Sequence, residues 1–139
     1  MAIFTLTDGY VAVNGVVLSD HANQITVEDT RDAVDITAFG ATSKATTKGL
    51  GDAKITVQFF QDFAASKVHA TLQPLIGSTT PVTIEVRATS AARSATNPAA
   101  LMSGLLMNYN MLSGGIGDAS TISAEFVNGA SAGLTYPTS

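Results

Sequence analysis

Alternation of apolar and polar residues, interrupted by turn-forming residues, recurs along most of this chain. The clearest case is Asn14-Gly15, which separates two short apolar runs at 10–13 and 16–18. Both turn residues tolerate the positive φ angles of a type I′ hairpin turn. A period of two is the period of a half-buried strand. Further runs of this kind predict strands at 24–28, 33–39, 54–61, 82–89 and 121–127.

A single stretch has the period of a helix instead. Asp62 suits the N-cap position, Gly77 suits a C-cap, and Pro74 is expected to end or distort the last turn. The apolar residues that recur at helical spacing are Ala64, Ala65, Val68, Leu72, Leu75 and Ile76. These features predict one mainly β domain over residues 1–139: a β-sandwich or partly closed barrel with one flanking α-helix at about residues 62–76.

Two segments have neither period. Residues 40–52 are rich in Gly and Thr, with Leu50 as almost their only apolar side chain, so we expect a long, flexible loop between two strands. A loop of this length in a compact domain is usually functional or disordered. Residues 128–139 are mostly Gly, Ala, Ser and Thr and are expected to form a flexible C-terminal tail.

The segment 99–112 is apolar on both faces of a strand. A strand of that kind needs a cover on each side, and in a chain of 139 residues we expect another subunit to supply the second cover. The candidate inter-subunit side chains on this strand are Leu101, Leu105, Met107, Tyr109 and Met111.

Charge and cysteine content exclude several classes of protein. Charged residues make up 13% of the chain, against roughly 25% in an ordinary soluble domain. Seven basic and 11 acidic residues give a net charge of −4, which argues against a protein that grips nucleic acid through clustered Lys and Arg. Without cysteine there is no disulfide scaffold, thiolate nucleophile or Cys-ligated zinc. No apolar run approaches the ~18 residues needed to cross a bilayer, so no membrane segment is expected.

The densest acidic stretch is Glu28, Asp29, Asp32 and Asp35, with Arg31 among them as a ready counter-ion. We expect Asp29, Arg31, Asp32 and Asp35 to be candidate inter-subunit charges, or the stretch to form a solvated turn. Carboxylates at this spacing are also possible calcium ligands, although the alternating order of an EF-hand loop is absent. Calcium is therefore kept as an alternative, and no metal is predicted.

No catalytic motif accompanies these residues. His21 and His69 are the two histidines, no Gly-x-Ser-x-Gly elbow is present, and no carboxylate lies inside an apolar run. The glycines at 114–117 and 49–51 do not have the spacing of a calcium-binding repeat or a phosphate-binding loop. We therefore expect neither enzymatic activity nor a cofactor.

Several stretches together resemble virion proteins of tailed bacteriophages. They are Asp29 to Gly40, Gly49 to Ala53 leading into the strand up to Phe63, Ser94 to Pro98, and Gly114 to Ser120. The resemblance is to the tail tube (major tail) family in particular, or to a closely related virion structural protein. It covers most of the chain from about Asp29 to Val127, and it consists of compositional patterns.

The resemblance implies β-sandwich-like subunits that form hexameric rings, whose strands merge into one inner barrel and whose stacked lumen carries DNA. It implies assembly in the host cytoplasm, and tape measure and tail terminator proteins as further partners. The acidic balance suits such a conduit, since a negative lining does not trap passing phosphates. Rings of this family stack through a long inter-strand loop, so the candidate stacking residues are Thr42, Ser43, Lys44, Thr46, Thr47, Lys48 and Leu50.

Two other interpretations remain open. One is a different virion part, such as a capsid decoration or head–tail connector protein. The other is a monomeric β-sandwich binding module, for carbohydrate for instance. Such modules usually present aromatic platforms, whereas this chain has no Trp and its three Tyr residues, Tyr10, Tyr109 and Tyr136, are scattered.

Overall fold

The hairpin predicted at Asn14-Gly15 is present. In the computed structural model, which describes residues 3–139, Asn14 and Gly15 have φ angles of 51° and 82°. They join β1 (Tyr10–Val13) to β2 (Val16–Val17), with Val13 opposite Val16. Positive φ at both central residues is the property that made Asn-Gly a turn signal.

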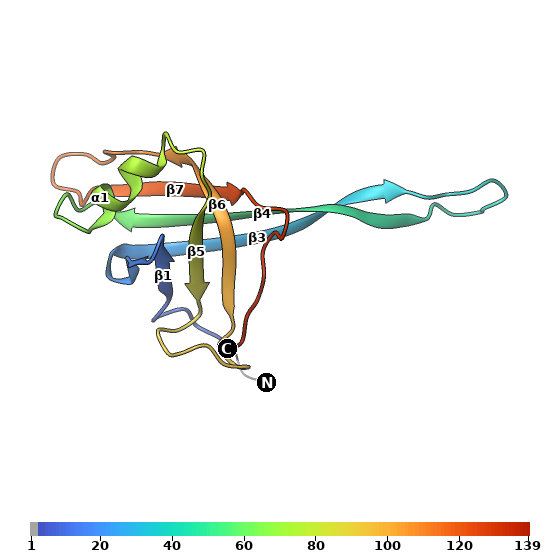
Figure 1. Ribbon diagram of the computed structural model, residues 1–139, viewed down its shortest axis with the longest axis horizontal. Coiled ribbons are helices and arrows are strands. Elements are labelled where there is room, and N and C mark those ends of the chain that lie inside the picture. Colours follow the sequence, from blue (N-terminus) through green and yellow to red (C-terminus); the bar gives the residue numbers. More distant parts are fainter. Residues whose placement is uncertain (1–2) are drawn as a thin grey trace.

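Within residues 3–139, seven strands form one antiparallel sheet in the order β2-β1-β5-β6-β7-β4-β3 (Figure 1). The other five strands are β3 (Ala22–Asp35), β4 (Thr46–Phe60), β5 (Val82–Arg87), β6 (Ala99–Tyr109) and β7 (Thr121–Asn128). The prediction of a mainly β fold with one flanking helix is confirmed. The sheet is open and sandwich-like, and it does not close into a barrel.

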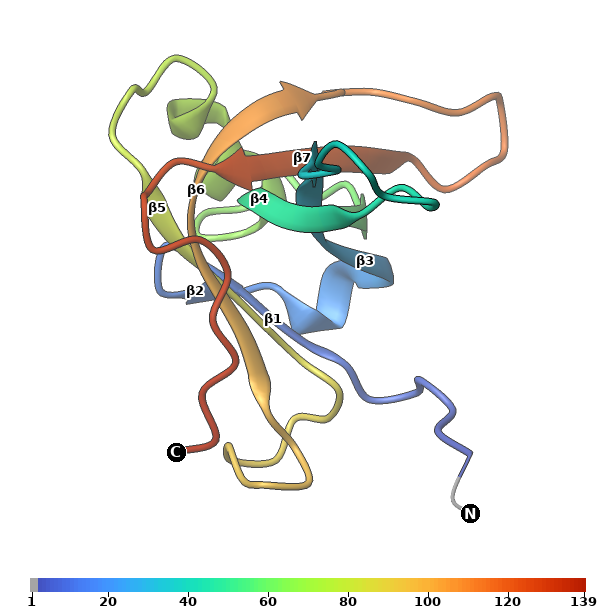
Figure 2. The ribbon, with the colours of Figure 1, turned by 90° about the vertical axis from the view of Figure 1, so that its right-hand side faces the viewer.

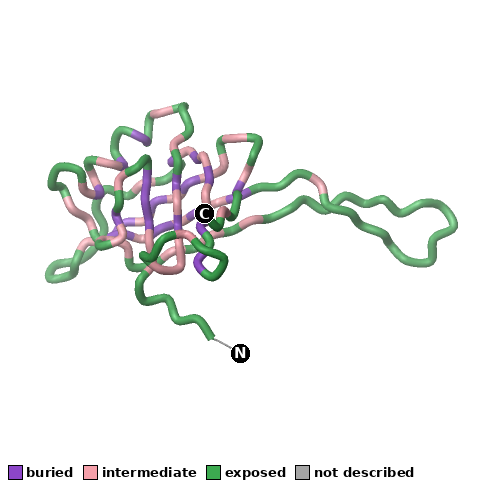
Figure 3. Tube along the Cα trace, turned by 60° about the horizontal axis from the view of Figure 1, so that its bottom comes forward, coloured by how far each residue is buried: buried purple, intermediate pink, exposed green. Residues whose placement is uncertain are grey.

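The core lies inside the curve of this sheet. β3, β4 and β7 run along the long axis of the molecule, β1 and β5 run across it, and β6 bends between the two directions (Figures 1 and 2). Fully buried side chains meet from both halves, among them Phe59 of β4, Phe126 of β7, Met102 of β6 and Ile84 of β5. Figure 3 shows the buried residues in this body. A curved sheet can thus supply both walls of one core.

The helix is shorter than the sequence indicates. The segment expected at 62–76 contains only α1 (Val68–Leu72), followed by the 3₁₀ turn η2 (Gln73–Leu75). Ser66 has a φ of 60°, which interrupts helical geometry. Asp62 also does not cap α1, because its carboxylate accepts a 2.9 Å hydrogen bond from the Ala64 backbone N–H. The apolar residues Val68, Leu72 and Leu75 still enter the core, as their spacing predicts.

The expected loop at 40–52 is partly wrong. β4 begins at Thr46, so the second half of that segment is a strand paired with β3, and the connection spans only residues 36–45. β7 pairs with β4 only at residues 54–60, so the part of the β3–β4 hairpin before Ala53 in β4 has no third strand beside it. The low apolar content of residues 40–52 suits a hairpin segment that faces no core. We call residues 29–52 the arm; it projects far from the body in Figure 1.

The segment after β7 runs back along the sheet. Leu101 of β6 exchanges backbone hydrogen bonds of 2.9 Å with Thr135, and the Ala99 N–H donates to the carbonyl of Pro137 at 3.0 Å. Leu134 is buried against the core. The sequence led us to expect a flexible tail over residues 128–139, and it did not predict these contacts. None of the helices within residues 3–139 is long and apolar enough to cross a membrane.

Candidate assembly surfaces

The arm carries all of the candidate stacking residues. Thr42, Ser43 and Lys44 lie in the connection between the strands, and Thr46, Thr47, Lys48 and Leu50 lie on β4. All seven are exposed, and Leu50 is 84% exposed. The strand register from Asp29 to Asp35 adds about 20 Å of reach at roughly 3.3 Å per residue. The structure thus brings these residues together on one projecting ribbon, whose β4 strand from Thr46 onward was predicted as loop.

Two glycines allow the strands of the arm to approach each other. The register slips between Arg31 and Ala33, so that the β4 segment around Gly49 bulges. A Cβ at Gly51 would lie 2.7 Å from Nη1 of Arg31, and one at Gly49 would lie 2.9 Å from Cγ2 of Val34. The side chains of β3 therefore lie across the glycines of β4, and this packing stiffens a ribbon that has no core beneath it.

The connection at the end of the arm, residues 36–45, which we call the tip, is closed by polar contacts. Thr37 donates its backbone N–H to the Asp35 carboxylate at 2.9 Å, and its hydroxyl accepts the Ala45 N–H at 2.8 Å. Hydrogen bonds from Thr37 lower the pKa of Asp35 below its ordinary value. The last ladder bond, from the Ile36 N–H to the Ala45 carbonyl, is 3.0 Å long. These hydrogen bonds fix the backbone at the point where the tip joins the two strands.

Apolar side chains on the arm have nothing to cover them. Phe39 is fully exposed, and Val34, Ile36 and Leu50 are also exposed. The alternation at 33–39 predicts a half-buried strand with Val34 and Ile36 on the same face. The structure places them on the unsupported ribbon instead. These four exposed side chains are therefore candidates for contact with another molecule.

The four candidate charges do not act as one group. Arg31 forms an ion pair with Asp29, and the Tyr136 hydroxyl donates to the other Asp29 oxygen at 2.7 Å. These hydrogen bonds, from Tyr136 and then Arg31, lower the pKa of Asp29 and tie the base of the arm to the C-terminal segment. Asp35 caps the tip, and Asp32 has no ion pair within residues 3–139.

The calcium alternative gains no support from this placement. Nowhere in residues 3–139 do three acidic, histidine or cysteine side chains gather as a metal ion would require. Along the strand, Asp29 and Asp35 lie six residues apart, which separates them by about 20 Å at the rise of a β-strand.

The apolar strand β6 does not present its candidate residues on one face. Leu101 and Leu105 are half-buried on the side opposite the core-facing Met102, and Met107 is exposed. The register slips between Leu106 and Asn108, which turns Tyr109 toward the core side. Met111 lies beyond the end of β6. The sequence did not reveal this bulge, which exchanges the two faces of the strand beyond Leu106.

A polar cluster that the sequence did not reveal surrounds His21. Its Nδ1 lies 2.8 Å from Asp20 and its Nε2 lies 2.8 Å from Asp62. Hydrogen bonds with Asp20, and then with Asp62, raise the pKa of His21 above its ordinary value. The cluster fastens the turn η1 (Ser19–His21) to the connection that follows β4. Asp62 was assigned to the helix cap, so only the tertiary structure identifies its partner.

The sheet ends in an unpaired edge. β3 pairs with β4 and with no other strand among the described residues, and β2 at the opposite edge has two residues. An edge strand exposes backbone N–H and C=O groups that can pair with a strand of another chain. The long β3 is therefore a second surface, besides the arm, that is suited to contact a neighbour.

Comparison with known proteins finds no matching family model and no matching curated protein. Similar solved structures do exist. One, described as the virion of a native gene transfer agent particle, has a chain that aligns with a TM-score of 0.71 and 8% identity, over 94% of this chain and 95% of that chain. Another, the tail of an empty gene transfer agent particle with C6 symmetry, gives 0.63 and 10%, over 84% and 82%. This chain therefore has the fold of a protein found in phage-like virion and tail particles.

Proposed function

We propose that this chain is a structural protein of a virion tail that assembles into stacked rings and forms the tail tube. The arm carries the proposal: it exposes Val34, Ile36, Phe39 and Leu50 on a ribbon with no covering layer. An isolated two-stranded ribbon is marginally stable in water. A neighbour that covers these side chains supplies the missing burial, at about 25 cal/mol per Å² of apolar surface.

The free edge of β3 supports closure into a ring. Strands that pair across subunits remove the edges of an open sheet, just as a closed barrel does. The similar tail structure has C6 symmetry, which favours six copies per ring. In this proposal, pairing through the sheet edge makes the ring, and the arm joins one ring to the next.

The charge of the chain suits a DNA conduit. The net charge of −4 repels the phosphates of DNA, so DNA passes through the lumen without being held. The role is that of a non-enzymatic part assembled in the host cytoplasm. The tape measure and tail terminator are the partners this role requires, inside the tube and at its end.

Truncation of the arm tests the proposal. Arg31 and Gly51 are opposite each other in the ladder, so an Asn-Gly turn can join them directly in place of residues 32–50. A milder variant joins Asp35 to Thr46 in the same way and removes only the tip. Both variants should fold and keep the monomer's melting temperature, because the removed residues lie outside the core.

Electron microscopy then separates the alternatives. We expect the full-length protein to form long tubes and the arm-truncated protein to form single rings or short stacks. Long tubes from the arm-truncated protein would contradict the role of the arm. Single rings from the full-length protein would favour a connector, and monomers at all concentrations would favour a decoration protein or a binding module.

A further inference from the structure

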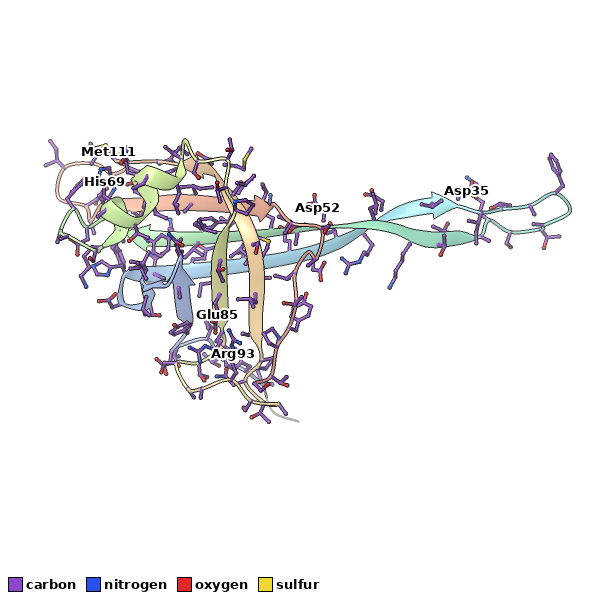
Figure 4. The ribbon with its side chains drawn as sticks, in the orientation of Figure 1. Asp35, Asp52, His69, Glu85, Arg93 and Met111 are labelled. Carbon is purple, nitrogen blue, oxygen red and sulfur yellow. The ribbon has the colours of Figure 1, made fainter. Side chains whose placement is uncertain are left out.

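The end of the molecule opposite the arm exposes a second group of apolar side chains. Figure 4 labels Asp35 on the arm and Met111 at the other end of the long axis. The connections that follow β4 and β6 meet there, beside α1 (Figure 1). We define the far-end patch as Phe60, Phe63, Met111, Leu112 and Ile116; all five are exposed, Leu112 to 67% and Ile116 completely.

Hydrogen bonds hold the far-end patch in shape. The Gln61 side-chain amide donates to the Met111 carbonyl at 2.6 Å and to the Tyr109 hydroxyl at 3.0 Å. The Gln61 backbone N–H donates to the Ser120 carbonyl at 2.9 Å. Gln61 thus fastens the connection after β4 to the connection between β6 and β7. The Phe63 ring packs on His69, with the ring centres 5.1 Å apart. A surface fixed in this way loses little conformational entropy when it is covered.

The two ends also differ in charge. The distal arm, residues 35–48, contains Lys44 and Lys48 against Asp35, which gives a net charge of +1, and neither lysine has an ion pair within residues 3–139. The two connections at the far end, residues 61–67 and 110–120, contain Asp62 and Asp118 against Lys67, which gives a net charge of −1. Apolar side chains beside opposite charges therefore occupy the two ends of one long axis, and opposite charges favour this orientation of approach.

We propose that the far-end patch receives the arm of a second copy of this chain. The two surfaces differ, so the contact is head-to-tail, and a contact of this type repeats without limit when it does not close on itself. The assignment rests on the proposed tube and adds to it the receiving surface. The tip side chains Ile36 and Phe39 would cover the apolar side chains of the patch, with Lys44 near Asp118.

One other surface competes for the arm. A hollow of about 240 Å³, lined by Leu6, Ile25, Val86 and Tyr136 among others, opens between β3 and the β5–β6 half of the sheet. It is lined mostly by apolar side chains, but it does not lie at the end of the molecule opposite the arm. Tyr136 at its rim is also bonded to Asp29 at the base of the arm. An arm bound in this hollow would also make a head-to-tail contact, so experiment must distinguish the two receiving surfaces.

Site-directed cross-linking tests the assignment, because the chain has no cysteine of its own. The variants Phe39→Cys and Ile116→Cys are mixed, assembled and treated with a short bismaleimide. A matched control mixes Phe39→Cys with Tyr136→Cys. We expect the first mixture to give at least tenfold more covalent dimer than the control or either variant alone. If Phe39→Cys does not assemble, Lys44→Cys replaces it in both mixtures.

Microscopy of the same samples distinguishes the outcomes. Tubes with strong cross-linking in the first mixture support the assignment. Tubes with cross-linking only in the control mixture, or in neither, overturn the far-end patch as the receiving surface and leave the tube intact. Failure of the wild-type protein to form tubes overturns the proposed function and this assignment with it.

Discussion

Replacing Phe39 with Ser should weaken the proposed stacking at least tenfold and leave the folded subunit unchanged. Phe39 is fully exposed in the single chain, so its loss should alter the free energy of unfolding by no more than about 0.5 kcal/mol. Covered by a neighbour, a Phe side chain contributes about 1.5–3 kcal/mol. Each 1.4 kcal/mol is tenfold in a binding constant, so each contact weakens by about ten- to a hundredfold. In the proposed tube every copy in a ring makes this contact, so the losses would multiply as each ring is added.

Pelleting of assembled protein over a concentration series measures the effect. We expect the critical concentration of Phe39→Ser to exceed that of the wild type by at least tenfold, with equal urea-unfolding midpoints. Ile76→Ser is the matched control, since Ile76 is an exposed apolar residue on the body, outside both the arm and the far-end patch. A critical concentration unchanged by Phe39→Ser, or raised equally by the control, would refute the role assigned to the tip.

Three further predictions concern the core, pH and salt. Phe59→Ala should lower the free energy of unfolding in urea by about 3–5 kcal/mol, because Phe59 is fully buried. The pKa of His21 is raised in the folded state, so the contribution of its protonated form to stability should be complete below about pH 6.5 and should decline as pH rises through the folded pKa. The melting temperature of His21→Asn should therefore depend less on pH in that range than the melting temperature of the wild type. Lys44→Gln should raise the critical concentration and weaken its dependence on NaCl, because the assignment places Lys44 near Asp118 of a second copy, while EDTA should have no effect; a loss of assembly in EDTA, restored by calcium, would instead support the calcium alternative.

The strands and the core were accessible from the sequence because local patterns decide them. Asn14-Gly15 fixes a turn through its own backbone preferences, and the alternation in 54–61 places Phe59 on the buried side wherever the strand lies in the sheet. The apolar spacing of Val68 and Leu72 similarly identified their buried face. These features depend on a few neighbouring residues, so one sequence suffices to find them.

The arm and the short helix depend on contacts far apart in the chain. Thr46 to Asp52 look like a loop because no apolar face is needed where the ribbon leaves the core, yet pairing with β3 makes them a strand. Asp62 looks like a helix cap, but His21, 41 residues away, binds its carboxylate. Such tertiary partners override local preference, and the alternation does not reveal them.

The candidate site shows the same division. The sequence identified the segment that forms the arm, and the resemblance assigned it to stacking. The alternation at 33–39 predicted a half-buried strand, but alternation does not distinguish a side chain covered by its own chain from one left for a neighbour, and the structure leaves Val34 and Ile36 exposed. The sequence also grouped the four candidate charges as one cluster. The structure separates them, because the Asp29 carboxylate pairs with Arg31 and accepts a hydrogen bond from Tyr136.

Electron microscopy of the purified wild-type protein, with light scattering on the same samples, measures assembly itself. The tube proposal predicts hollow, sixfold tubes above a critical concentration, built of 14.2 kDa subunits and spaced by a regular axial repeat. Monodisperse 14.2 kDa particles at every protein and salt concentration would contradict it.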